Sequence, residues 1–187
     1  QDSVTPFYTI RLDPSNFPFR EEVSPLRNLG SWITLALSML REVLTEEVVL
    51  CDLQASTGTE VIDALLDMLE STGSLRDRAQ AREDVLLNER RSSTGMQHGV
   101  AIPHAKTSAV DSLIAAVAVT RDPIEFDSLD GKPCRIFIMT LSPLDQNGPH
   151  MRFLAEIGRI LKSGKNRKAL LAATNSSELL HAFIGAS

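Results

Sequence analysis

The chain has 187 residues, of which 43% are hydrophobic and 23% are charged. These values fit a globular domain and exclude a wholly disordered chain. The formal net charge of −5 argues against a broad basic face, so no nucleic-acid partner is expected. The two cysteines, Cys51 and Cys134, are far apart in the sequence and give neither a disulfide framework nor a paired metal-ligand spacing. We therefore expect a reducing, cytoplasmic setting.

The N-terminal region differs in composition from the rest. Residues 1–28 hold four of the nine prolines and four of the nine aromatic residues, and proline at this density opposes helices and central strands. We expect an irregular arm or linker there, or an arm that docks its aromatic side chains on the domain or on a second copy. The apolar stretch Trp32–Leu40 is about half as long as a membrane span, and no basic stretch followed by an apolar run opens the chain. No direct membrane insertion is expected, and a homo-oligomer is left open.

Residues 29–187 are expected to form one domain, which begins with helices. Helix-forming residues predict a helix over 30–43, and the β-branched run 48–51 predicts a short strand. Thr57–Glu60 is a capping box that opens a helix ending at Gly73. A second, more charged helix is predicted over 77–91, with Val85–Leu87 turned inward.

Strands follow, and then helices return. Short or continuous apolar runs predict strands at 99–102, 113–119 and 136–141, with a turn at Asp130–Gly131. Continuous apolar strands are covered on both faces. The last third predicts a helix from near Pro149 to around Gly164, a short piece over 169–173, and a final helix opened by the capping box Asn175–Glu178. The expected fold is α/β: a mixed β-sheet with helices on both faces.

One segment carries most of the chemistry. The common signatures for nucleotide binding, metalloproteases and serine hydrolases are absent. What remains is Asn88–Lys106, which is predicted to be a helix end with arginines, a loop rich in hydroxyls and glycine, and a short strand. Pro103 lacks an N–H, so it should end or edge the sheet and leave His104 at a strand tip facing a cleft. Glycine-rich loops with hydroxyls and arginines are typical of phosphate handling.

A metal site is the weaker interpretation of the histidines. An extended chain would place His98 and His104 roughly 20 Å apart, so they would share an ion only if the chain bent sharply at Gly99. His150 is the remaining candidate for a third ligand, and scattered histidines do not define a zinc site. No metal and no cofactor are expected.

Glu89–Lys106 resembles the active-site region of the enzyme IIA domains of the bacterial sugar phosphotransferase system, in the fructose, mannitol and nitrogen-regulatory branch. The matching residues are Glu89–Arg90, Ser93–Gly95 and Gly99–Lys106. The resemblance continues from about Leu40 to about Ile184, and includes Pro123–Phe126, Asp130–Gly131, Leu141–Pro143 and His150.

The resemblance implies a phosphotransferase mechanism. His104 would accept a phosphoryl group from the phosphorylated carrier HPr and pass it to an enzyme IIB domain, in sugar uptake or in regulation of the nitrogen type. The neutral imidazole suits this role because it is nucleophilic and forms a labile P–N bond. His150 would hydrogen-bond the phosphate or orient His104, and Arg90 would stabilise the phosphate charge.

The resemblance also assigns the pocket around the phosphate. Thr94, Gly95 and Gly99 would shape it, with their backbone N–H groups as candidate donors. Two departures bear on this loop: Gln97 stands where the family often has glycine, and His98 is a third histidine near the site. A backbone with positive φ at Gln97 would be strained. The alternative function is a regulatory binding module on the same fold that is never phosphorylated.

Overall fold

The computed structural model describes residues 39–185, and the expected arm over 1–28 lies outside this range. Residues 39–43 are helical, which is the only part of the helix predicted over 30–43 that falls within the described residues. The remaining elements are η1 Glu46–Val48, β1 Val49–Leu53, α2 Gly58–Ser71, α3 Arg78–Arg91, β2 Val100–Ala101, β3 His104–Lys106, β4 Ile114–Ile124, β5 Cys134–Ser142, α4 Asn147–Lys162, α5 Gly164–Ala172 and α6 Ser176–Ile184.

The five strands form one mixed sheet. Its order is β1-β4-β5-β2, and β3 also pairs with β5, so β2 and β3 share one edge. β1 runs parallel to β4, β4 runs antiparallel to β5, and both short edge strands run parallel to β5. The mixed α/β architecture predicted from the sequence is confirmed.

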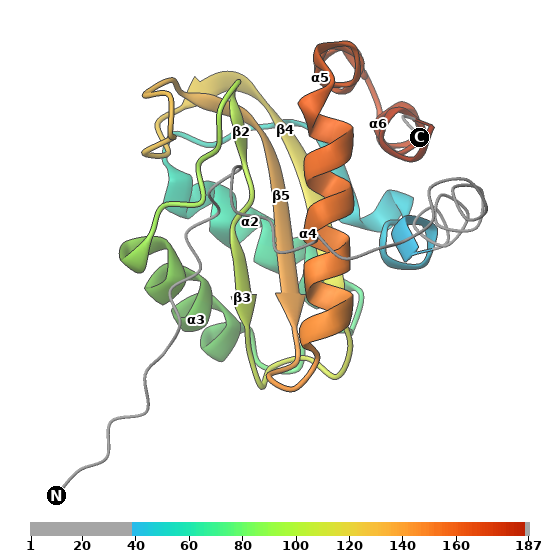
Figure 1. Ribbon diagram of the computed structural model, residues 1–187. Helices are drawn as coiled ribbons and strands as arrows, with labels where there is room; N and C mark the ends of the chain where they lie inside the picture. The colour runs from blue at the N-terminus through green and yellow to red at the C-terminus, as the bar shows by residue number, and fades with distance from the viewer. Residues whose placement is uncertain (1–38, 186–187) are drawn as a thin grey trace, which may run out of the picture.

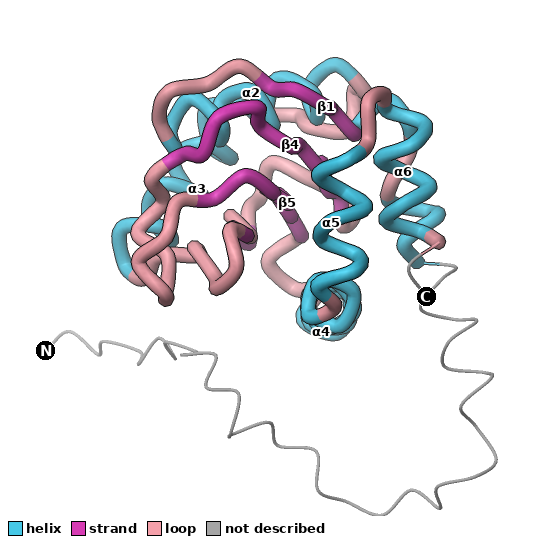
Figure 2. The backbone as a smooth tube through the Cα atoms, turned by 90° about the horizontal axis from the view of Figure 1, so that it is seen from above, coloured by secondary structure: helices cyan, strands magenta, loops and turns pink. Residues whose placement is uncertain are grey.

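Helices cover both faces of the sheet. In Figure 1 α4 crosses in front of the strands and α2 lies behind them, and Figure 2 shows the strands between α2 on one side and α4 to α6 on the other. The central strands β4 and β5 are almost wholly buried along the stretches predicted to be continuous apolar runs. Within residues 39–185, no helix is long and apolar enough to span a membrane.

Both predicted capping boxes form, with the same variation. Thr57 Oγ1 accepts from the Glu60 N–H, and Asn175 Oδ1 accepts from the Glu178 N–H. In each case the glutamate accepts from the residue before the N-cap, not from the cap itself: Glu60 from the Ser56 N–H and Glu178 from the Thr174 N–H. Local hydrogen bonds therefore start α2 and α6, as the sequence indicates.

One detail of the prediction is wrong, and the structure refines two others. Leu87 is exposed, because on α3 it lies about 160° around the helix from buried Val85. Pro103 lies on an edge of the sheet, which agrees with one of the two outcomes expected for it, and the edge resumes after it as β3, with the Pro103 carbonyl accepting from the Thr140 N–H at 3.0 Å. The helix predicted to start near Pro149 starts two residues earlier, at Asn147, since proline is tolerated in a first turn.

Candidate active site around His104

His104 is the first residue of β3, immediately after the break in the edge strand at Pro103. Its ring Nδ1 lies 2.8 Å from the Ile102 carbonyl oxygen. A carbonyl oxygen only accepts hydrogen bonds, so Nδ1 carries the proton and donates it. In the neutral imidazole the lone pair is then on Nε2. The local backbone therefore selects the tautomer that leaves Nε2 nucleophilic.

The neighbouring helix fixes the backbone of His104 as well. Asn88 Nδ2, near the end of α3, donates to the His104 carbonyl oxygen at 2.8 Å. On its other side β3 pairs with β5, with His104 opposite Thr140. The histidine is thus held by α3, by β5 and by its own preceding residues. Asn88 lies at one end of the segment singled out from the sequence, but it was given no role there.

His150 lies beside His104, with ring centroids 5.7 Å apart. It sits in the first turn of α4 and is buried. Its Nδ1 lies 2.9 Å from Ser142 Oγ, on the strand β5. Burial, together with the nearby His104 and Lys106, lowers the pKa of His150 to about 4, so this imidazole is neutral at pH 7.

The tautomer of His150 follows from the surroundings of Ser142, which is fully buried. If the hydroxyl donates to Nδ1, both groups are satisfied; if it accepts, its own O–H is left without an acceptor among the hydrogen bonds of the described residues. The first arrangement puts the ring proton of His150 on Nε2. His150 is then a neutral hydrogen-bond donor next to a neutral nucleophile.

Thr140 is a further buried hydroxyl on this face. It is two residues before Ser142 on β5, so the two side chains point to the same side of the sheet. Thr140 Oγ1 is the buried side-chain oxygen that has no hydrogen-bond partner within the described part of the chain. The signal in the sequence was a pair of hydroxyl residues, Thr140 and Ser142, at the end of a strongly apolar run.

The Glu89 carboxylate anchors the loop from 92 to 99 by accepting two hydrogen bonds from it. Thr94 donates both its N–H, at 2.8 Å, and its hydroxyl, at 2.5 Å, to the Glu89 carboxylate. The Gly95 N–H donates to Ser93 Oγ at 3.1 Å. These two N–H groups, expected as phosphate donors, are therefore engaged within the loop in this structure.

The glycines of this loop have different roles. A Cβ on Gly95 would lie 2.4 Å from the Phe126 carbonyl oxygen and 2.7 Å from Ser128 Cα, so Gly95 permits a close backbone approach. Gly99 has a φ of +76°, a conformation that favours glycine. The expected strain at Gln97 is not found, since the other positive φ of this turn, +66°, falls on His98. The His98 N–H donates to Asp130 Oδ2 at 2.9 Å, which stabilises that conformation.

Arg90 is not brought into contact with His104. It is exposed and makes no hydrogen bond or ion pair within the described residues. Residues two apart on a helix point about 200° from each other, so Arg90 points away from the side on which Asn88 reaches His104. Arg91, three residues after Asn88, lies on that side, as consecutive turns of a helix require.

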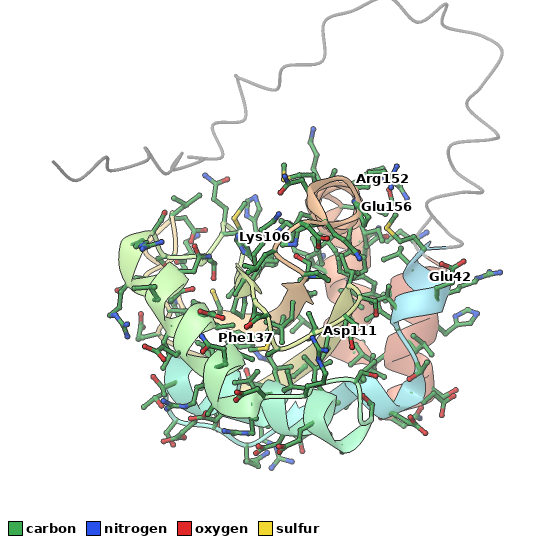
Figure 3. All side chains as sticks on the ribbon, turned by 90° about the horizontal axis from the view of Figure 1, so that it is seen from below. Glu42, Lys106, Asp111, Phe137, Arg152 and Glu156 are labelled. Carbon is green, nitrogen blue, oxygen red and sulfur yellow. The ribbon has the colours of Figure 1, made fainter. Side chains whose placement is uncertain are left out.

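Lys106 supplies a positive charge near the pair of histidines. Its Nζ donates to the Leu144 carbonyl oxygen at 3.1 Å and to Asn147 Oδ1. Figure 3, which views the molecule from below, labels Lys106 at this end of the domain, and Arg152 on α4.

Within the described residues, no three histidine, cysteine, aspartate or glutamate side chains gather in a way that could hold a metal ion.

A family model and several known proteins match most of this chain. The family model described as "Phosphoenolpyruvate-dependent sugar phosphotransferase system, EIIA 2" matches residues 42–185. The chain is 31% identical over 141 residues to the fructose-specific EIIABC component of Bacillus subtilis, a match that covers 75% of this chain and 22% of that protein. It is 35% identical over 118 residues to the fructose-specific EIIA component of Haloferax volcanii, covering 63% and 77%.

Solved structures agree with the fold. The nitrogen regulatory protein IIA-Ntr of Neisseria meningitidis has a TM-score of 0.71 at 27% identity, covering 76% of this chain and 97% of that one. The mannitol enzyme IIA of Escherichia coli, in its complex with phosphorylated mannitol enzyme IIB, has a TM-score of 0.66 at 16% identity, covering 76% and 97%. This chain therefore belongs to the EIIA type 2 family of the phosphoenolpyruvate-dependent sugar phosphotransferase system, whose members are phosphotransfer components.

Proposed function

We propose that this chain is a phosphohistidine carrier: His104 takes a phosphoryl group from phosphorylated HPr and passes it to an enzyme IIB domain. The observation that carries the proposal is the 2.8 Å hydrogen bond between His104 Nδ1 and the Ile102 carbonyl oxygen. It leaves Nε2 with a lone pair and no proton to remove. As the sequence led us to expect, the proposed place of this reaction is the cytoplasm.

The transfer needs little beyond positioning and charge compensation. The Nε2 lone pair of His104 attacks the phosphorus atom of the donor's phosphohistidine. The new Nε2–P bond forms as the donor's N–P bond breaks, and the donor imidazole keeps the electron pair. Nδ1–H continues to donate to Ile102, so the phosphorylated ring keeps its orientation. The reverse sequence, with enzyme IIB as the acceptor, completes the relay.

His150 is the proposed partner of the phosphoryl oxygens. Its ring lies beside that of His104, and with Ser142 donating to Nδ1 its own N–H is on Nε2. A neutral donor stabilises developing negative charge without an ion pair that would hold the phosphoryl group too tightly. Lys106 adds a positive charge at the same end of the sheet, and Arg90 or Arg91 would add one from the end of α3.

Exposed apolar side chains occur at positions adjacent in sequence to residues of the site, a feature that suits a surface that docks other proteins. Leu87 precedes Asn88 on α3, Met151 follows His150 on α4, and the carbonyl of Leu144 binds Lys106; their exposed fractions are 37%, 41% and 63%. Together with the nearby cations they favour an acidic and apolar partner surface. The known complex of Escherichia coli mannitol enzyme IIA with phosphorylated mannitol enzyme IIB supports a IIB domain as one such partner.

The test is mass spectrometry after incubation with phosphoenolpyruvate, enzyme I and HPr. The wild-type chain should gain one acid-labile phosphate, His104→Gln should gain none, and His181→Gln, a matched change at a histidine on α6, should behave like the wild type. If phosphorylated HPr leaves the wild type unlabelled, the chain is instead a regulatory binding module on the same fold. The loop at Gln97 and His98, which departs from the family's pattern, is then the first feature to change back to that pattern.

A further inference from the structure

A pocket of about 290 Å³ lies between β1, β4, β5 and the segment that follows α5. This is about ten times the volume that one water molecule occupies in the liquid, and small-molecule sites begin near this size. One of its lining residues, Arg135, is five residues before Thr140 on β5, a separation of roughly 17 Å along the strand. The pocket is therefore distinct from the site around His104.

One wall is a strained bulge that is held by an ion pair. The register of β1 against β4 shifts between Leu50 and Leu53, and Asp52 within this bulge has a φ of +59°. Arg121 Nε donates to Asp52 Oδ1 at 2.8 Å, and its Nη2 donates to Oδ2. Bulges of this kind redirect side chains, and strain in the backbone is found at functional sites. The pairing leaves this wall neutral.

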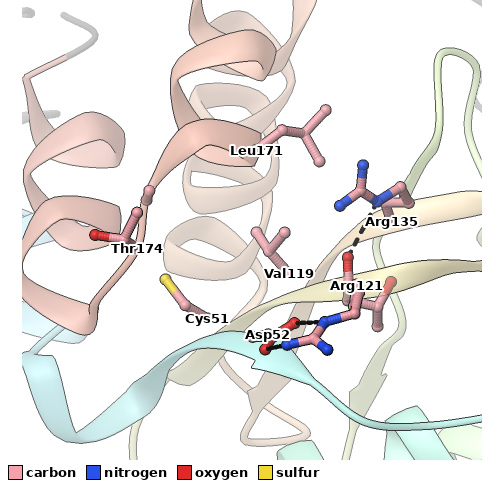
Figure 4. A pocket seen from close by; sticks show the side chains of 9 residues that line it. Cys51, Asp52, Val119, Arg121, Arg135, Leu171 and Thr174 are labelled. Carbon is pink, nitrogen blue, oxygen red and sulfur yellow. Dashed lines mark hydrogen bonds and ion pairs between the residues drawn. The ribbon is translucent and has the colours of Figure 1, made fainter.

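Arg135 gives the pocket its net positive charge. Its Nε donates to the Thr120 carbonyl oxygen at 3.0 Å, which fixes the plane of the guanidinium. Its Nη1 and Nη2 have no acceptor within residues 39–185. Figure 4 shows both arginines on one side of the pocket, with Cys51 and Thr174 on the other. A fixed guanidinium with free Nη groups matches the geometry of a carboxylate.

The remaining walls are apolar or neutral. Val119, Leu171 and Ala173 contribute hydrocarbon. The Cys51 thiol donates to the Asn175 carbonyl oxygen at 3.2 Å. Burial, then Glu178 and Asp52, raise the pKa of this thiol, so it stays uncharged. Because the negative charge of Glu178 acts on the Cys51 side, a second negative charge on a ligand would be repelled there.

We propose that this pocket binds a small monocarboxylate, with its carboxylate on the Nη groups of Arg135 and its apolar body against Val119 and Leu171. The inference is independent of the phosphoryl transfer proposed for His104.

The test is a titration of the whole chain, followed by the amide signals in ¹H–¹⁵N NMR spectra. Butyrate is the probe, butyramide its uncharged analogue, and glutarate the dicarboxylate. We expect saturable shifts with butyrate at Val119–Arg121, Arg135 and Leu171–Thr174, at least tenfold weaker binding of glutarate, and no saturation with butyramide. Equal binding of butyrate and butyramide, or shifts without saturation, would overturn the proposal.

Two variants assign the binding to the pocket. Arg135→Gln should weaken butyrate binding at least tenfold, whereas Arg159→Gln, on α4 outside the pocket, should not. Leu171→Glu changes an exposed helix residue, and its carboxylate would occupy Arg135 in place of the ligand, so butyrate binding should be lost; Leu129→Glu is its matched control. Because Leu171→Glu removes no buried group, it keeps the test decisive even if Arg135→Gln does not fold. Wild-type affinity in Leu171→Glu would contradict the proposal.

Discussion

The two ends of the central strands β4 and β5 pair their polar groups in different ways. At one end, His104 and His150 are held by a backbone carbonyl and by a serine hydroxyl, and within residues 39–185 no carboxylate is hydrogen-bonded to either ring. At the other end, Asp52 and Arg121 form an ion pair next to the guanidinium of Arg135. Neutral hydrogen bonds leave the Nε2 lone pair of His104 available for chemistry and the Nε2–H of His150 available to donate, whereas fixed charges suit the binding of an anion. The same sheet therefore presents a reactive end and an electrostatic end.

The largest expected effect falls on the two histidines. His104→Gln should abolish phosphoryl transfer, and His150→Ala should slow it about 100-fold, the usual loss for one donor to a developing negative charge. Ser142→Ala, which removes only the partner of His150, should cost less than His150→Ala. Rapid-quench measurements of transfer from phosphorylated HPr give the rates. Full activity of His150→Ala would break the comparison, because a neutral donor would then have no role at the reactive end.

The buried His150 should make stability depend on pH. Its pKa of about 4 in the folded chain is below its ordinary value of 6.5, so between these values the unfolded chain binds the proton and the folded chain does not. Stability is therefore fully present above pH 6.5 and falls as the pH drops towards 4, by about 3 kcal/mol in total. Urea unfolding of the wild type and of His150→Gln across this range measures the difference. Parallel profiles for the two proteins would show that His150 is not the group responsible.

Gly95 should tolerate no side chain. A Cβ there would meet the backbone of Phe126 and Ser128, so Gly95→Ala should destabilise the fold by about 2 kcal/mol through overpacking. Gly158→Ala is the control, since nothing lies within 4 Å of its Cβ position and it is inside α4; it should be neutral or slightly stabilising. Thermal unfolding of both variants checks this, and similar melting temperatures would contradict the close approach.

Thr140→Val tests the energetic cost of the buried hydroxyl that has no hydrogen-bond partner at the reactive end. Replacing a buried hydroxyl that has no partner with a methyl group of similar shape should raise the free energy of unfolding by about 1 kcal/mol. Chemical denaturation measures it. If the variant is instead destabilised, the hydroxyl makes a hydrogen bond, for instance to a buried water molecule, and the neutral pairing at this end is more extensive than the protein groups alone indicate.

The smallest effect distinguishes two adjacent arginines. Arg91 lies on the same side of α3 as Asn88, whereas Arg90 points away. Arg91→Gln should therefore slow transfer severalfold, and Arg90→Gln should change it less, in the same rapid-quench assay. The reverse order would restore Arg90 to the role that the resemblance implies and would require the end of α3 to turn when a partner binds.

Much of the fold could be predicted because the signals were local. Continuous apolar runs predicted β4 and β5, and Thr57 and Asn175 marked the starts of α2 and α6. The interrupted edge strand could not be predicted, since Pro103 removes a donor but keeps its carbonyl, and only the pairing with Thr140 on β5 shows that the strand resumes.

The sequence predicted which residues make up the candidate site better than it predicted their contacts. His104 and His150 do lie side by side, whereas no motif marked the hydrogen bonds of Asn88 to His104 and of Ser142 to His150. The pocket near Arg135 gave no motif at all, because it depends on a bulge at Asp52 and on the register of three strands.

The most direct test of the central claim is the nitrogen that carries the phosphate. Long-range ¹H–¹⁵N correlation spectra of the phosphorylated, ¹⁵N-labelled chain distinguish the two ring nitrogens of His104. The account predicts phosphate on Nε2, with Nδ1 still protonated and donating to the Ile102 carbonyl. Phosphate on Nδ1 of His104, or on another histidine, would contradict it.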